Sequence, residues 1–374
     1  MTVLDLPRSF SPHDALTRPA AVTIHGIATA YPPYVLRQDD IMAEATKVFA
    51  HRPQLMARMA ASYGNAGVRA RQSCVPLSWY GQPHGWPERM RLFEENAVAL
   101  LAEAARKVMA ATGVAPAQIG ATVTVSSTGI VTPSLDSLLQ GPLGLSPTVQ
   151  RLPVFGLGCA GGVIGLSRAA ALARATPGQW VLFMCTELCS LTFRAGDDSK
   201  SNVIATTIFG DGAAAILLRA GTFDNDAPGT GRRVTLRAWG EHTWPDSRDV
   251  MGWAVEDDGL GVIFSRHIPT LVRDQMRPVT DAFLAQHGLS QSDLDGLIVH
   301  PGGEKVITAI EAAYDLAPDS LSDARAVLAA HGNMSAVTVL AVFERALTER
   351  LPGRYLMAAL GPGFSLGMAL VEIA

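Results

Sequence analysis

The stretch Phe155-Gly-Leu-Gly-Cys-Ala-Gly-Gly162 places one cysteine, Cys159, among small residues between two apolar segments. The segment before it, Leu152-Pro-Val-Phe155, predicts a strand, and the Ala-rich segment after it predicts a helix. The thiol would lie at the helix N-terminus, where unpaired N–H groups and the helix dipole favour an anion. Because the thiolate is the nucleophilic form and the small neighbours leave room for a substrate, Cys159 is a candidate nucleophile. The alternative is a buried structural cysteine, which is the common case.

The composition is that of a folded chain of enzyme size. The 374 residues are 48% hydrophobic and 17% charged, enough for a large core, and the net charge of -4 does not favour nucleic acid as a partner. The first 20 residues do not resemble a secretory leader, and no apolar run is long enough to span a membrane. Four cysteines are too few for a disulfide framework, so we expect reduced thiols in a cytoplasmic protein.

Segments of strand type and helix type alternate along the chain. Residues 1–20 carry prolines and charges without periodicity, which predicts a loose N-terminal arm. The continuous apolar run 180–187 predicts a strand buried on both faces, and residues 38–63, 90–112 and 279–287 predict helices. This alternation predicts α/β layers.

The chain also shows signs of two halves. A segment rich in Gly, Asp and Arg at 221–233 predicts a linker, which separates residues 21–230 from residues 231–374. Gly212-Ala-Ala-Ala-Ile-Leu-Leu218 in the first half faintly resembles Gly367-Met-Ala-Leu-Val-Glu-Ile373 in the second. The similarity suggests an internal duplication.

Two further residues supply what a cysteine nucleophile needs. His300 ends an apolar run and precedes Pro301-Gly-Gly303, and a strand end before a glycine-rich turn is where α/β proteins place reactive groups. A histidine there can hold a cysteine as the thiolate or accept its proton, the alternative being an ordinary histidine at a strand end. Asn333 lies before a predicted helix and is either a helix cap or an amide donor for an oxyanion.

In this order, these motifs resemble those of type III polyketide synthases, the chalcone synthase-like branch of the thiolase superfamily, and of bacterial alkylpyrone and alkylresorcinol synthases in particular. The resemblance covers nearly the whole chain, from about residue 22. It implies a thiolase-like, five-layered αβαβα fold of two pseudo-repeated halves, the first with the cysteine and the second with the histidine and asparagine. The matching motifs are Gly156-Leu-Gly-Cys-Ala-Gly161, Phe209-Gly-Asp-Gly-Ala-Ala-Ala215, His300-Pro-Gly-Gly303, Gly332-Asn-Met-Ser335 and Gly361-Pro-Gly363.

The resemblance implies an acyltransferase in which Cys159 carries the growing acyl chain as a thioester. His300 and Asn333 would hydrogen-bond the thioester carbonyl of malonyl-CoA and stabilise the enolate that forms as carbon dioxide leaves. Losing one such donor typically costs ~10²–10³ in rate. CoA thioesters would be the substrates, without a metal or redox cofactor. The pair Cys185 and Cys189 has no matching second pair, so no metal site is expected.

The resemblance also assigns the walls of the cavity. Phe209 matches the aromatic gate between the CoA tunnel and the cavity. The second gate position, a phenylalanine in plant members, falls on Val262, while a shift in the alignment would place Phe264 there. The small size of several pocket residues, together with the lost second phenylalanine, favours a fatty acyl starter. Other positions expected to line or approach the cavity are Ser127, Thr132, Glu187, Cys189, Thr192, Ser335 and Gly363.

Partners follow from the same resemblance. Family members are homodimers in which the partner chain inserts a residue near the cavity floor, and Thr132 matches that position. Arg58 matches a residue that grips the CoA phosphates, and Arg69 and Arg71 are further candidates because arginine pairs well with phosphate. Delivery of the starter by an acyl carrier protein instead of CoA is the alternative.

Two other functions are open from the sequence. A ketosynthase III performs one condensation on acyl carrier protein with the same Cys-His-Asn set, but the flanks Pro301-Gly-Gly303 and Met334-Ser335 favour the polyketide branch. An inactive acyl-CoA-binding homologue is the second alternative, although all three reactive residues are present. The expected activity is iterative condensation of malonyl-CoA onto an acyl starter, followed by cyclisation to an alkylpyrone or alkylresorcinol.

Overall fold

The computed structural model describes residues 20–221, 232–349 and 352–374. The expected N-terminal arm and most of the expected linker at 221–233 therefore lie outside the described residues. The centre of the described part is a nine-stranded mixed sheet in the order β11-β12-β13-β8-β1-β7-β6-β4-β5. Strands β1 (Val22–Ala30) and β8 (Val234–Thr243) pair over only three residues each, so the sheet consists of two halves with a short junction.

The two sheet halves repeat the same strand order and directions. In the first half β1 is antiparallel to β7, β7 is antiparallel to β6, and β6 is parallel to β4. In the second half β8, β13, β12 and β11 follow with the same three relations. The strands are β4 (Ile119–Ser126), β6 (Trp180–Leu188), β7 (Asp211–Ala220), β11 (Gly296–Val299), β12 (Gly353–Gly361) and β13 (Ser365–Ile373).

This repetition explains the similarity between two distant pieces of sequence. The segments that begin at Gly212 and Gly367 lie in β7 and β13, which occupy equivalent places in the two halves. The predicted two-fold repetition of the fold is therefore confirmed. Strand β5 (Gln150–Phe155) has no equivalent and forms the free edge of the first half.

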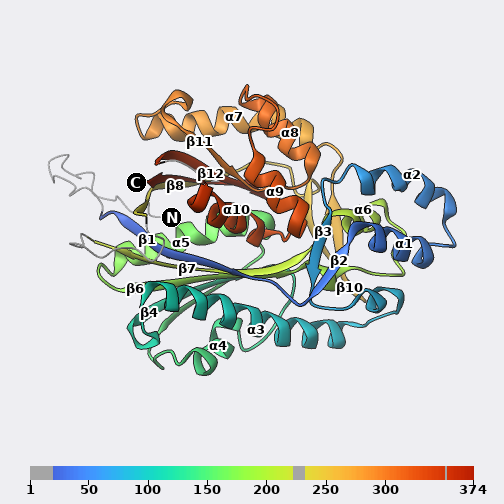
Figure 1. The fold of residues 1–374 in the computed structure, drawn as a ribbon, viewed down its shortest axis with the longest axis horizontal. Coiled ribbons are helices and arrows are strands. Elements are labelled where there is room, and N and C mark those ends of the chain that lie inside the picture. The colour runs from blue at the N-terminus through green and yellow to red at the C-terminus, as the bar shows by residue number, and fades with distance from the viewer. Residues whose placement is uncertain (1–19, 222–231, 350–351) are drawn as a thin grey trace, which may run out of the picture.

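Helices complete five layers (Figure 1). Helices α5 (Gly161–Ala175) and α10 (Ala336–Glu349) lie between the sheet halves, and each contacts strands of both. Helix α3 (Trp86–Thr112), with α4 (Leu135–Leu143) beside it, covers the outside of the first half. Helices α7 (Ile268–Gln286) and α8 (Glu304–Ala313) cover the outside of the second half. The predicted αβαβα order is thus present.

The middle helices differ from the outer ones in their sequence. Helix α5 is buried at ten of its fifteen positions, on all sides, because both of its faces meet a sheet. Its many Gly and Ala residues allow the close approach that this sandwich requires. Helix α7 instead buries one stripe, formed by Ile268, Val272, Met276, Thr280 and Phe283.

Shorter elements gather at one end of the molecule, on the right in Figure 1. They are the helices and strands that surround the candidate site, and none of them belongs to the five layers. Their bounds are β2 (Tyr34–Arg37), α1 (Gln38–Val48), α2 (Pro53–Gly64), β3 (Ala70–Ser73), α6 (Lys200–Ile208), β9 (Met251–Glu256) and β10 (Gly259–Phe264). Helix α9 (Ser322–His331) lies nearer the middle of the molecule, where it contacts α10 and β3.

Two predicted helices have different bounds in the structure. Residues 38–63 form two helices, α1 and α2, because the chain turns at residues 49–52 and Pro53 starts α2, the position where proline is tolerated. Helix α7 begins at Ile268 and not at residue 279, since it continues through Pro278. The buried stripe of α7 outweighs the roughly 3 kcal/mol that an interior proline costs. No helix in the described ranges is both long and apolar enough to cross a membrane.

Candidate active site

Cys159 lies in the 3-10 turn η3 (Gly158–Ala160) that leads into α5, as the sequence predicts. A Cβ atom on Gly158 would lie 2.5 Å from the ring of Pro362, and one on Gly162 would collide with the carbonyl oxygen of Ala336. The glycines around Cys159 are therefore needed for packing against the Gly361-Pro-Gly363 turn and against α10. The sequence predicts that these glycines leave room for a substrate, but at Gly158 and Gly162 the space is taken by Pro362 and Ala336.

His300 follows β11 directly, and its backbone N–H donates to Ala358 of the neighbouring strand at 2.9 Å. Its side chain is 5% exposed, yet neither ring nitrogen has a hydrogen-bond partner among the described residues. Buried polar atoms are nearly always paired, so an unpaired imidazole points to a missing ligand. The ring is thus available to a substrate.

Asn333 connects α9 to α10, and its side chain is fixed in one orientation. The backbone N–H of Ser335 donates to Oδ1 of Asn333 at 2.8 Å, which leaves Nδ2 as the outward donor. Nδ2 donates one N–H to the carbonyl oxygen of Gly302 at 3.3 Å, two residues after His300. The second N–H remains for a ligand, and it lies beside the imidazole segment.

A chain of contacts through Ser335 and Gly302 links the three residues. Ser335 hydrogen-bonds the Cys159 thiol, and the turn after β12 packs on η3. The N-termini of α5 and α10 therefore meet at the cysteine, from the two halves of the fold. Cys159 and Asn333 are thus connected through Ser335, and the segment that carries His300 is joined to Asn333 through Gly302.

Burial governs the protonation of the thiol and the imidazole. It raises the pKa of Cys159 to about 12, and it lowers the pKa of His300 to about 3. Both directions favour uncharged groups. Of the two arrangements that the sequence leaves open, burial therefore disfavours a resting thiolate–imidazolium pair and favours a thiol with a neutral imidazole.

Three spaces surround the site, and aromatic residues separate them. The cysteine chamber, about 30 Å³, is lined by Cys159, Ser335, Trp253 and Val262 among others. The entrance cleft, about 620 Å³, opens to solvent between α2, α6 and the Gly302-Gly303 turn. Phe264 lines both, so Phe264 stands between cleft and chamber. Of the two candidates for the second gate position, Val262 lines the chamber only, whereas Phe264 lies at the boundary with the cleft.

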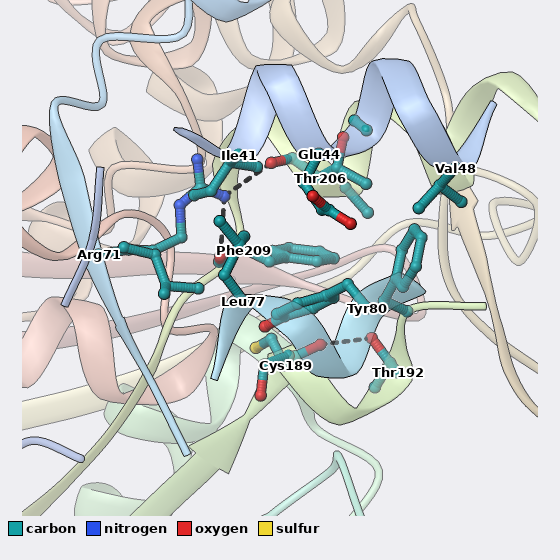
Figure 2. A pocket seen from close by; sticks show the side chains of 15 residues that line it. Ile41, Glu44, Val48, Arg71, Leu77, Tyr80, Cys189, Thr192, Thr206 and Phe209 are labelled. Carbon is teal, nitrogen blue, oxygen red and sulfur yellow. Dashed lines mark hydrogen bonds between the residues drawn. The ribbon is translucent and has the colours of Figure 1, made fainter. Parts of the chain in front are cut away.

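The third space, the inner cavity, lies beyond Phe209 and measures about 50 Å³ (Figure 2). Phe209 lines both the chamber and this cavity, and its ring is tilted against Trp253 with centroids 6.1 Å apart. Cys189 and Thr192 line the inner cavity and not the cysteine chamber. Most of the remaining lining is apolar and comes from α1, α6 and the turn η1 (Leu77–Gly81): Ile41, Ala45, Val48, Leu77, Tyr80 and Ala205.

The rim of the entrance cleft is cationic. Lys200, Arg266 and Lys305 line it, and none of the three forms an ion pair with a carboxylate within the described ranges. The expected residue Arg58 is exposed on α2 but is not among the residues that line the cleft. Arg71 is fully buried, so it cannot meet CoA phosphates, which corrects that expectation.

Glu187 lies behind the chamber in a cluster of hydroxyl groups and lines none of the three spaces. Ser127 donates to it through Oγ at 2.7 Å and through its backbone N–H at 3.0 Å, and Thr128 donates at 2.7 Å. Burial raises the pKa of Glu187 to about 7, although these donors oppose the shift. Ser127 and Glu187 therefore support Ser335, which donates to the same carboxylate at 3.4 Å.

The last two expected positions are at the periphery. Thr132 is exposed at the surface, next to Ile130, in the loop between β4 and α4. Gly363 follows Pro362, which lines the chamber, but Gly363 itself does not line any of the three spaces.

Several residues of the site were not predicted from the sequence. Trp253 comes from the β9–β10 hairpin, which the Asp258-Gly259 dipeptide between two apolar runs would have indicated. The rim cations and the buried Arg71 carry no local signal, because their importance depends on contacts between distant segments.

Comparisons with known proteins agree with the fold. Residues 79–222 and 236–371 match the family models of the N-terminal and C-terminal domains of chalcone and stilbene synthases. A protein of Bacillus subtilis (strain 168) named "Putative chalcone synthase" is 37% identical over 93% of this chain and 97% of its own length. An alpha-pyrone synthesis polyketide synthase-like protein of Mycobacterium tuberculosis (strain H37Rv) is 29% identical, over 94% and 91%.

A solved structure gives the same result. The crystal structure of 1,3,6,8-tetrahydroxynaphthalene synthase from Streptomyces coelicolor A3(2), a bacterial type III polyketide synthase, has a TM-score of 0.86 at 26% identity. It covers 94% of this chain and 99% of that one. The chain therefore belongs to the chalcone and stilbene synthase family, the type III polyketide synthases, and is an acyltransferase with a thiolase-like fold.

Proposed function

We propose that this synthase loads a fatty acyl starter onto Cys159, extends it with malonyl-CoA and cyclises the product to an alkylpyrone or alkylresorcinol. In the loading step, Sγ of Cys159 attacks the starter thioester while His300 accepts the thiol proton, and CoA leaves. What supports this role is that neither ring nitrogen of His300 has a hydrogen-bond partner among the described residues, so one nitrogen has a lone pair to accept the proton.

Extension depends on the two donors. Malonyl-CoA would place its thioester carbonyl against a ring N–H of His300 and the free N–H of Asn333 Nδ2. When carbon dioxide leaves, its bonding electrons pass to this carbonyl oxygen, where the two fixed donors stabilise the enolate. The enolate carbon then attacks the Cys159 thioester and expels the thiolate. The chain, now two carbons longer, is carried on CoA and returns to Cys159 for another round.

The observation that carries the fatty starter is the inner cavity. An acyl group on Cys159 has a space beyond Phe209 whose walls are mostly apolar, and ligand pockets for alkyl chains have this character. About 50 Å³ holds roughly three to five water-sized groups, so the cavity as it stands suits a tail of a few carbons beyond the gate. Longer tails would require α1 to move outward.

The relatives support this class of product without fixing it. One of them is named for alpha-pyrone synthesis, while the neighbour of known structure makes 1,3,6,8-tetrahydroxynaphthalene by its name. The ketosynthase III alternative and the inactive homologue are not favoured, because both halves match the chalcone and stilbene synthase models. Alkylpyrone or alkylresorcinol remains our choice on account of the inner cavity.

Substrates would arrive as CoA thioesters through the entrance cleft. Lys200, Arg266 and Lys305 are placed to meet the phosphates, since they are exposed cations without carboxylate partners on the rim of that cleft. Arg58 is a more remote candidate for the same role. No separate cofactor takes part in this scheme. CoA thioesters and four buried free thiols suit a cytoplasmic enzyme.

We also propose a homodimer formed at the free edge of β5. The edge leaves backbone donors and acceptors unpaired, and it carries exposed Leu152 and Phe155, with Ile130 beside it. An exposed apolar sheet edge favours pairing with another strand, and a second copy presents the same edge. Thr132 lies next to this surface, where it would approach the partner chain.

A starter panel tests the fatty acyl proposal. The purified protein is given malonyl-CoA with acyl-CoAs of increasing length, an aromatic acyl-CoA, or no starter. We expect kcat/KM to be highest for alkyl starters. Val48→Phe narrows the inner cavity, so it should lower the ratio of kcat/KM for long starters to kcat/KM for short starters by about tenfold or more. Met42→Phe is the matched control, because Met42 is on the same helix but faces a separate groove. Turnover of aromatic starters alone, or of malonyl-CoA alone, would refute the fatty starter.

A further inference from the structure

Arg71, from β3, is a buried cation that binds the backbone at the end of α6. Its Nη1 donates to the carbonyl oxygens of Thr206 at 2.8 Å and Phe209 at 3.0 Å (Figure 2). Its Nη2 donates to the carbonyl oxygen of Thr207 at 3.0 Å. Nη2 also donates to Oε1 of Gln38. The last carbonyls of a helix lack partners within the helix, and a cation is favoured there by the helix dipole.

Arg71 also lines the inner cavity, but both of its Nη atoms are used in these hydrogen bonds. The side chain is 4% exposed, and within the described ranges it forms no ion pair with a carboxylate. It is therefore neither a surface residue nor part of a salt bridge. Burying a cation is costly unless hydrogen bonds compensate, and here three of the compensating acceptors belong to residues 206–209.

Residues 206–209, to which Arg71 donates, are hydrogen-bonded to the backbone of Asn333. The N–H of Asn333 donates to the carbonyl of Ile208 at 2.7 Å, and the N–H of Gly210 donates to the carbonyl of Asn333 at 3.0 Å. These bonds form an isolated parallel bridge between Phe209 and Asn333. The gate aromatic and the amide donor thus share one small piece of backbone structure.

The stem of Arg71 packs against both sides of this bridge. A Cβ atom on Gly210 would lie 3.2 Å from Cβ of Arg71, and one on Gly332 would lie 3.4 Å from it. A Cβ on Gly332 would also lie only 2.6 Å from the carbonyl oxygen of Ile208. Glycine at 210 and 332 therefore lets the two strands of the bridge lie directly on the arginine.

We propose that Arg71 is a positioning residue that holds the backbone of Phe209 and of Asn333 in place. It thereby fixes the position of Phe209, the gate to the inner cavity, and of Asn333, the donor to the malonyl thioester. The inference rests on the proposed function for the role of Asn333, but the geometry it describes is independent of that role. Preorganised donors are effective only when they are held in place, and a displacement of about 1 Å can cost ~10²-fold in rate.

The test compares Arg71→Met and Arg71→Lys with the wild type in three measurements. Malonyl-CoA decarboxylation reports on Asn333, alkylation of Cys159 by iodoacetamide reports on the thiol with His300, and amide hydrogen exchange reports on the bridge. For Arg71→Met we expect decarboxylation to fall by about 10²-fold with alkylation little changed. The amides of Gly210 and Asn333 should exchange faster. Arg71→Lys, which keeps a donor, should recover part of the loss.

Arg89→Met is the matched control, because Arg89 is also a buried arginine that binds main-chain carbonyls, those of Leu191 and Phe193, away from the bridge. It should keep its decarboxylation rate and its exchange at 210 and 333. If Arg71→Met does not fold, Gln38→Leu removes the side-chain partner of the guanidinium and is measured in the same way.

The outcomes separate this inference from the proposed function. A wild type that does not decarboxylate malonyl-CoA refutes the proposed function, while the exchange measurement still decides whether Arg71 holds the bridge. Unchanged exchange at Gly210 and Asn333 in Arg71→Met overturns the inference. A sharp rise in alkylation of Cys159 together with the loss of decarboxylation would indicate that Arg71→Met is unfolded, and unchanged exchange at Gly210 and Asn333 in Gln38→Leu then overturns the inference.

Discussion

At the scale of single residues, the chemistry of the site depends on uncharged side chains that burial keeps uncharged. Cys159 and His300 are both driven toward their neutral forms, so the nucleophile is activated only when a thioester arrives. Glu187 is also buried and its pKa is raised, but it is surrounded by hydrogen-bond donors and lines none of the three spaces of the site. Its protonation should therefore affect stability more than specificity.

Glu187 gives a prediction on pH and stability. Its pKa is raised from 4.5 in the unfolded chain to about 7 in the folded protein. Between these values the folded state keeps a proton that the unfolded state has lost, so this contribution to the free energy of unfolding is full below pH ~4.5 and is lost as pH rises through 7. The loss is about 3 kcal/mol.

Urea unfolding of the wild type and Glu187→Gln from pH 4.5 to 8 checks this. As pH rises, the unfolding free energy of the wild type should fall relative to that of Glu187→Gln, because glutamine is uncharged at every pH. A difference that stays constant over this range would contradict a raised pKa. Asp293→Asn serves as control, since hydrogen bonds from Ser290 lower the pKa of this exposed carboxyl.

The sequence predicted the reactive residues and missed much of their setting. Cys159, His300 and Asn333 each follow or precede a recognisable element among small residues, so local pattern and family resemblance located them. The sequence left two candidates for the second gate position, Val262 and, on a shifted alignment, Phe264. Both line the chamber and only Phe264 also lines the cleft; a shift of two residues keeps the same face of the hairpin, so only the paired strands show which side chain reaches the cleft.

At the scale of elements, the β9–β10 hairpin is the wall of the cysteine chamber that is least tied to the core. It pairs with no other strand in the described part of the chain. Arg194 anchors it, with Nη1 at 2.6 Å from Glu256 and 2.8 Å from Asp258, and Trp86 donates to the carbonyl of Glu256 at 3.0 Å. The hairpin carries Trp253 and Phe264, so its position sets the chamber's shape.

Arg194→Ala should therefore loosen the hairpin without unfolding the layers. Both carboxylates are about half exposed, so each ion pair contributes only roughly 0.2–1 kcal/mol. We expect water to enter more easily, so that malonyl-CoA decarboxylation without condensation rises severalfold relative to product. The ratio of carbon dioxide released to product formed is the measurement, with Arg273→Ala, which loses an exposed pair with Asp274, as control. An unchanged ratio despite faster hydrogen exchange in the hairpin would contradict this role.

Elements with a strong period were predictable, and those set by packing were not. The strand at 180–187, the helix after Cys159 and the helix after Asn333 all agree with the structure within a few residues. The single helix expected at 38–63 is broken, and α7 extends past its proline, because contacts with distant segments outweigh local propensity there. Those two regions flank the site, which is why its walls were the least predictable part.

At the scale of the whole molecule, the repeated halves explain why the site lies where it does. Each half contributes one central helix, and the two helix N-termini meet at Cys159. In the described part of the chain the sheet ends at β11 on one side and at β5 on the other, and β5, which breaks the repetition, is the edge that we propose for the dimer. The repetition could be predicted from the similar sequences of β7 and β13. The edge at β5 could not be predicted, because the apolar residues of a strand are known to be exposed only when the neighbouring strands are known.

Leu152→Lys tests the dimer. Leu152 is 39% exposed in the isolated chain, and placing a charge there in both copies should raise the dissociation constant of the dimer by about 10²-fold or more. Light scattering coupled to gel filtration gives the mass. Val255→Lys is the control, since Val255 is 76% exposed at the far hairpin and should leave the dimer intact. A wild type that is monomeric at micromolar concentration would rule out this edge as an interface.

The central claim is that Cys159 carries the starter as a thioester, and intact-protein mass spectrometry tests it most directly. The protein is incubated briefly with one long acyl-CoA and no malonyl-CoA. A mass increase of one acyl group that maps to the peptide containing Cys159 and is absent from Cys159→Ala is the predicted result. The same acyl load on Cys159→Ala, or product formed by Cys159→Ala at the wild-type rate, would contradict it.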